Sequence, residues 1–256
     1  MKSYPIVLLL LLFSCSVNQE EKAEKKEENV APLSIDQKKR TWQTGTCDSD
    51  TSVYCTTVAF DIPRFSGRGD LANKLNDQLQ HHLLKSYLKD SSATDYEAYA
   101  SQFIEDFESI KSRIDEAFGW HNLVNSEVIR HDSKVMVIKT QIETYTGGAH
   151  GMEETYYLNF SLPNGEVLQL KDVMKNGFES KLNEITYGML VKQFDTSPDE
   201  FTGDDAYYTS NFGLLEEDLV FYYNIYEVAP FALGSLEISI SYDRLTDIMK
   251  PAYLPE

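Results

Sequence analysis

The hydrophobic pattern is clearest between Val135 and Phe160, where apolar and polar residues alternate on both sides of a glycine-rich segment. A period of two places successive side chains on opposite faces of a β-strand. The segment between the two runs is Tyr145–Gly151 (YTGGAHG), and its three glycines within five residues permit backbone conformations with positive φ. The pattern therefore predicts a hairpin of two long strands joined by a glycine turn.

Other parts of the chain have helical or strand-like spacing. Apolar residues recur every three or four positions from Leu71 to about Leu88, from Asp95 to about Phe118 and from Phe178 to about Phe194. Further strands are expected at Ser52–Pro63, Trp120–Arg130, Val167–Leu170, Leu219–Ile225 and Ser235–Tyr242, and a last short helix at Arg244–Met249. This order predicts an α+β fold, an antiparallel sheet with helices packed on one face.

The N-terminus has the features of an export signal. Lys2 precedes the apolar run Ile6–Phe13, which is too short to span a bilayer. Leu12-Phe13-Ser14-Cys15 then resembles the lipobox of bacterial lipoproteins, which implies cleavage before Cys15 and lipidation of this residue. The alternative is a plain secretory signal in which the cysteine is incidental. Residues 16–43 begin with a charged stretch poor in apolar residues, and we expect them to form a disordered tether.

The net charge indicates which partners to expect, and the cysteines indicate how the chain is cross-linked. The formal net charge of −18 argues against nucleic acid and anionic membrane surfaces as partners, and favours a cationic partner unless the acidic surface serves only solubility. Cys47 and Cys55 lie eight residues apart around the turn-like Asp48-Ser49-Asp50. In an oxidising compartment this predicts a disulfide. Two reduced thiols or a metal site are the alternatives, although no CxxC spacing or nearby histidine supports a metal.

Three segments occur in a fixed order: Tyr145–Gly151, Leu168–Val173 (LQLKDV) and Phe221–Gly234 (FYYNIYEVAPFALG), the last followed by an alternating strand. Together they resemble the domain-of-unknown-function 3298 family of exported bacterial proteins. The region from about Cys55 to Phe118, a strand followed by helices, resembles the 4163-type domain that commonly precedes it. With the N-terminal features above, this resemblance leads us to expect four regions: a lipoprotein signal peptide (1–15), the tether (16–43), a 4163-like part (44–130) and a 3298-like part (131–256). We expect the last two to form one compact unit.

Relatives implied by this resemblance include the extracellular part of RsiV-type anti-sigma factors, which bind lysozyme, and the non-catalytic part of PdaC-type peptidoglycan deacetylases. Because the chain has no transmembrane helix and no sigma-binding segment, we do not expect it to regulate a sigma factor. We also expect no added deacetylase domain.

His150, in the glycine turn, is the most tempting catalytic residue, with Glu143, Glu153 and Glu154 near it in sequence. No GxSxG elbow, HExxH motif or other His–carboxylate spacing typical of zinc accompanies it. We therefore expect no catalytic residues, metal or cofactor. The predicted ligand-binding residues are Tyr145, Gly147, Gly148 and His150, because loops on a rigid sheet often carry binding residues.

These observations favour a non-enzymatic binding module, lipid-anchored in the cell envelope as an outer-membrane lipoprotein that faces the periplasm or the surface. Its expected partner is a cationic protein such as lysozyme, or a peptidoglycan fragment. The alternative is a cell-wall glycan hydrolase or deacetylase that uses His150 and an acidic neighbour. The direction in which His150 points distinguishes the two, since catalysis requires a cleft that brings it against a carboxylate.

Overall fold

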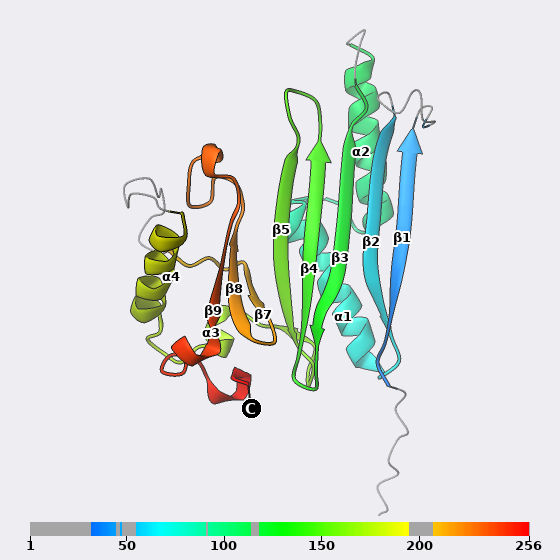
Figure 1. Cartoon of the computed structure of the whole chain (residues 1–256). Helices are drawn as coiled ribbons and strands as arrows, with labels where there is room; N and C mark the ends of the chain where they lie inside the picture. The colour runs from blue at the N-terminus through cyan, green and yellow to red at the C-terminus, as the bar shows by residue number, and fades with distance from the viewer. Residues whose placement is uncertain are drawn as a thin grey trace, which may run out of the picture. The chain divides into compact units, whose positions relative to one another are not determined.

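The strands form two sheets (Figure 1) in a computed structural model that describes residues 32–44, 47, 55–90, 92–113, 118–194 and 207–255. The first sheet has the order β1 (Ser34–Thr44), β2 (Thr56–Ser66), β3 (His121–His131), β4 (Val135–Tyr145), β5 (Met152–Ser161) and β6 (Glu166–Val167). The second has the order β7 (Phe212–Leu214), β8 (Asp218–Tyr223) and β9 (Leu236–Ser241).

The helices are α1 (Asp70–His81), continued by a π-helical turn at His82–Tyr87, then α2 (Tyr96–Lys111), α3 (Leu170–Val173) and α4 (Glu179–Phe194). Short 3-10 turns lie at Phe231–Leu233, Tyr242–Arg244 and Pro251–Tyr253, and the last helix expected at 244–249 is reduced to the second of these turns and the loop after it. Within the described part of the chain, no helix is long and apolar enough to cross a membrane.

The predicted long hairpin is present as β4 and β5, which pair antiparallel from Val135↔Ser161 to Thr144↔Met152. Because side chains alternate between its two faces, the hairpin contributes to two hydrophobic cores. Met136 and Ile138 belong to the core under α1 and α2, whereas Val135 and Val137 on the opposite face belong to the core of the second sheet and α4. The hairpin therefore joins the two halves of the fold, because both of its faces are buried along this stretch.

The α+β class, with mainly antiparallel strands, is confirmed, and the structure adds two details that the sequence did not indicate. The strands divide between two sheets, and β2 pairs parallel to β3. A parallel pair needs a long crossover, which here contains α1 and α2. Figure 1 shows both helices on one face of the first sheet.

Residues 34–43, assigned to the tether from the sequence, instead form most of β1. This strand pairs with β2 along its whole length, from Ser34↔Ser66 to Thr44↔Thr56. Most of its side chains are exposed, and Trp42 packs edge-on against Phe60 with ring centroids 6.2 Å apart. Lysine and arginine are typical of edge strands, which main-chain hydrogen bonds can hold without an apolar face. Composition alone therefore misassigned the segment.

The Cys47–Cys55 disulfide is confirmed, with Cα atoms 5.0 Å apart. Cys55 directly precedes β2, so the bridge ties Cys47, just beyond β1, to the start of the neighbouring strand. The predicted turn between the two cysteines lies outside the described residues.

The outer edge of β5 is closed by side-chain amides where no strand pairs with it. β6 reaches only Phe160 and Ser161. Farther along, Tyr157 N donates to Asn211 Oδ1 (2.9 Å), and Asn211 Nδ2 donates to Thr155 O (2.7 Å). Thr155 N donates to Asn224 Oδ1 (2.7 Å). Amide side chains thus supply the donors and acceptors that a neighbouring strand would otherwise offer.

Asn159 makes the converse contact, because its side chain extends from β5 and bonds to the main chain of β7. Its Nδ2 donates to Phe212 O (2.7 Å), and its Oδ1 accepts from Leu214 N (2.9 Å). Asn159, Asn211 and Asn224 are all buried, and we call them the asparagine seam. They hold the second sheet one side chain away from β5, so the two sheets do not merge into one.

The turn between β4 and β5 has the predicted backbone. Gly147 and Gly148 have φ of 96° and 100°, whereas Gly151 is not in the positive-φ region. A Cβ at Gly148 would meet no atom within 4 Å, so only the backbone conformation requires glycine there.

We predict that Asn211→Ala lowers the free energy of unfolding by about 1–3 kcal/mol, because it leaves Tyr157 N without its acceptor. Denaturant unfolding measures this. The control is Asn73→Ala on the exposed face of α1, expected to change stability by no more than about 0.5 kcal/mol. Equal effects of the two substitutions would contradict the role assigned to the seam.

A second prediction concerns the turn. Gly148→Val should lower the free energy of unfolding by about 1–2 kcal/mol, since a β-carbon disfavours the left-handed region. His150→Ala, at an exposed position of the same turn, should leave the melting temperature nearly unchanged. If His150→Ala proves as destabilising as Gly148→Val, the histidine is a structural residue.

Candidate functional site

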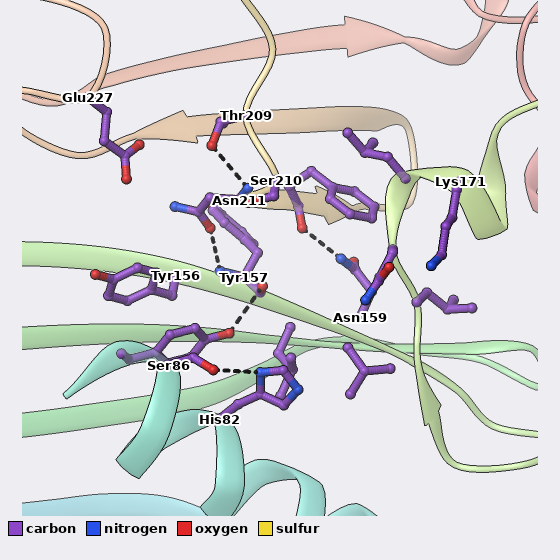
Figure 2. A pocket seen from close by; sticks show the side chains of 17 residues that line it. His82, Ser86, Tyr156, Tyr157, Asn159, Lys171, Thr209, Ser210, Asn211 and Glu227 are labelled. Atoms are coloured by element: carbon purple, nitrogen blue, oxygen red, sulfur yellow. Dashed lines mark hydrogen bonds between the residues drawn. The ribbon is translucent and has the colours of Figure 1, made fainter. Parts of the chain in front are cut away.

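A cleft of about 610 Å³ lies beside the asparagine seam (Figure 2). It is bounded by the π-helical turn, by β5, by the segment leading into α3 and by the segment leading into β7. Its lining consists of His82, Ser86, Tyr87, Tyr156, Tyr157, Leu158, Asn159, Val167, Leu168, Gln169, Leu170, Lys171, Thr209, Ser210, Asn211, Phe212 and Glu227. The volume is in the range of small-molecule sites.

The π-helical turn presents three polar side chains to the cleft. Its wider spacing is visible in the bond from Leu88 N to Leu83 O (2.9 Å), five residues back. Residues five apart therefore come onto one side, and the His82 and Tyr87 rings lie 6.2 Å apart. Ser86 Oγ lies 3.4 Å from His82 Nδ1. Single π turns within helices are frequent at functional sites.

Tyr87 and Tyr156 form an aromatic wall, stacked with centroids 4.2 Å apart and planes 4° from parallel. Tyr87 Oη donates to Tyr157 O (3.4 Å), and Tyr156 Oη donates to Glu154 Oε1 (2.8 Å). Burial raises the pKa of both phenols. Both therefore remain neutral at physiological pH, and the wall carries no charge of its own.

Two titratable groups on the lining have shifted pKa values. Burial, with a contribution from neighbouring His81, lowers the pKa of His82, so its imidazole is neutral near pH 7. Burial raises the pKa of Glu227, and Glu154 adds to this, although hydrogen bonds from Asn224 oppose it. Because the folded-state pKa of Glu227 is raised, its contribution to stability is complete at acid pH and is lost as the pH rises through that pKa.

The predicted ligand-binding residues lie elsewhere. Tyr145 Oη donates to Gly148 O (3.1 Å) within the exposed turn, and neither Tyr145, Gly147, Gly148 nor His150 lines the cleft. His150 Nδ1 lies 3.0 Å from Gly151 O, and its ring packs 5.3 Å from that of Phe231. His150 thus meets backbone and an aromatic ring, which removes the geometry that catalysis by this residue requires.

The sequence pattern does not identify the residues of the cleft, because they come from five separate segments. A signal was available in Asn159, a residue type with low β-propensity in the middle of an otherwise strand-like run. Among the described residues, no group of three or more His, Cys, Asp or Glu is placed to hold a metal ion.

Two parts of the chain match two different family models. Residues 171–243 match the family described as protein of unknown function DUF3298, and residues 49–153 match the family described as deacetylase PdaC. The expected 3298 resemblance is thereby confirmed for the C-terminal part, whereas the 4163-type assignment stays a prediction.

The chain is also similar to a curated protein in sequence and to two solved structures in fold. The chain is 28% identical over 138 residues to the peptidoglycan-N-acetylmuramic acid deacetylase PdaC of Bacillus subtilis, covering 51% of this chain but only 30% of the relative's length. DUF3298 family proteins from Pseudomonas aeruginosa and Bacteroides fragilis share the fold, with TM-scores of 0.69 and 0.71 at 23% and 22% identity. Each alignment covers 88% of this chain and 98% of the other.

The expectation that the protein is not an enzyme is corrected by these matches. Both the family model over residues 49–153 and the curated relative carry the name of a deacetylase. The earlier expectation rested on the lack of a recognisable motif, and motifs reveal only those sites whose residues are close in sequence. The cleft shows that polar side chains distant in sequence do converge in this fold.

Proposed function

We propose that this protein acts in the deacetylation of a cell-wall glycan and that the cleft beside the asparagine seam holds an N-acetylated sugar. The observation that carries the proposal is the cleft itself, in which an aromatic wall stands beside hydroxyl, amide and imidazole groups. The deacetylase match covers the π-helical turn that supplies three of these side chains. The activity of the much longer relative enters here only as support.

The chemistry of the lining suits a sugar. The apolar face of a pyranose ring packs against aromatic rings, and Tyr87 with Tyr156 offers a neutral aromatic surface. Thr209, Ser210 and Gln169 add hydroxyl and amide groups that can bind sugar hydroxyls or an acetamido group. Such a combination of an apolar wall and a few polar groups is typical of small-molecule sites.

His82 replaces His150 as the proposed proton acceptor. Amide hydrolysis needs a base that removes a proton from the attacking nucleophile. The lowered pKa of His82 keeps its imidazole in the basic form near neutral pH, and it faces the cleft beside Ser86. His81 precedes it on the helix but does not line the cleft, because adjacent helical residues point in different directions.

The purified chain should bind N-acetylated peptidoglycan fragments and release acetate from them. His82→Gln should lower acetate release about 100-fold or more while binding persists, as expected for loss of a general base. His131→Gln, at an exposed position of β3 outside the cleft lining, is the matched control and should leave both unchanged. Calorimetry measures binding, and an enzymatic acetate assay measures release. A wild-type chain that neither binds these fragments nor releases acetate would refute the proposed function.

We also propose that the protein is held in the cell envelope by lipid on Cys15, a residue outside the described ranges. The support is the apolar run followed by Leu12-Phe13-Ser14-Cys15. Cys15→Ala should yield unprocessed or soluble protein that no longer incorporates labelled palmitate. A variant that still fractionates with membranes and still takes up the label would exclude lipidation at this position.

A further inference from the structure

Lys171 is the one lysine or arginine among the described residues that line the cleft. No hydrogen bond or ion pair of its amine with another described residue is present, in contrast to Lys74, whose amine pairs with Glu166 at the neighbouring β6. Figure 2 shows Lys171 at the end of the cleft opposite Glu227. A cation without a carboxylate partner is thus presented to the cleft, away from its acidic end.

The backbone that carries Lys171 is held in place. Lys250 Nζ donates to Lys171 O (3.0 Å) and to Asp172 O (2.9 Å), and Gln169 N donates to Asp172 Oδ2 (2.9 Å). Val173, two residues after Lys171, is fully buried. The side chain of Lys171 therefore extends from a fixed point, which reduces the ordering that a bound ligand must impose on this segment.

The negative charge of the protein makes the position of Lys171 important for the choice of ligand. The whole chain carries a formal charge of −18, and Glu227 lies at the other end of the cleft, with Glu154 near enough to raise its pKa. This field disfavours an anionic ligand unless a local cation compensates. An anionic group would therefore be accepted at the Lys171 end and disfavoured at the Glu227 end, so a ligand with one carboxylate would bind in one orientation.

We propose that Lys171 is a specificity-determining residue that pairs with a carboxylate on the bound sugar, so that the cleft prefers an N-acetylated amino sugar bearing an acidic substituent over its neutral counterpart. This inference rests on the proposed function, because it assumes that the cleft binds a glycan. It adds the residue that recognises the acidic group and the orientation of the ligand, whereas N-acetylmuramic acid itself is the sugar in the name of the relative.

The test compares two ligands that differ only in charge: a glycan fragment containing N-acetylmuramic acid, and the same fragment with its carboxylate converted to the methyl ester. At low ionic strength the wild type should bind the acid about tenfold more tightly, and added salt should reduce the preference by screening the pair. Lys171→Met keeps the aliphatic stem and should abolish the preference, while the affinity for the ester stays the same. Lys171→Arg should retain the preference.

Lys192→Met, at an exposed position of α4 outside the cleft lining, is the matched control and should keep the preference. Equal binding of acid and ester by the wild type overturns the role of Lys171, and so does a preference that survives in Lys171→Met. In both cases the proposed function stands, because the glycan still binds. Failure of the wild type to bind either fragment overturns the proposed function and this inference together.

Discussion

Main-chain groups on the outer edge of β5 are buried without a neighbouring strand, and the asparagine seam provides their hydrogen-bond partners. A buried N–H or C=O left unpaired costs about 1–3 kcal/mol, so this edge needs either a strand or polar side chains. A strand would extend the first sheet and bring the second into it. Asparagine amides satisfy the same groups while keeping the two sheets separate, and the cleft lies beside them.

The seam links fold to chemistry because Asn159 and Asn211 both line the cleft. Their amides are already engaged with backbone, so they shape the cleft, while groups on its other sides remain for a ligand. The π-helical turn provides His82, Ser86 and Tyr87 from one side, and the pinned α3 segment provides Lys171 from another. A neutral imidazole and an ammonium group on a neutral aromatic surface suit an N-acetylated sugar acid better than an apolar ligand.

Much of the fold was predictable from periodicity. Alternation identified the β4–β5 hairpin, and its glycine turn has the expected positive φ at Gly147 and Gly148. β1 was missed because main-chain pairing, which leaves no compositional trace, holds this polar edge strand. The π turn was missed because the spacing of Leu79 and Leu83 fits α and π geometry alike. The cleft was missed because its residues meet only through tertiary packing, so local spacing drew attention to His150 instead.

Amide hydrogen exchange at Thr155 and Tyr157 tests the central claim, that side-chain amides replace a strand along β5, most directly. Their N–H groups donate to Asn224 Oδ1 and Asn211 Oδ1. If these two hydrogen bonds persist in solution, both amides should exchange as slowly as the central amides of β4, with protection approaching that of global unfolding. Exchange at the rate of an open edge strand, with β4 still protected, would contradict the account.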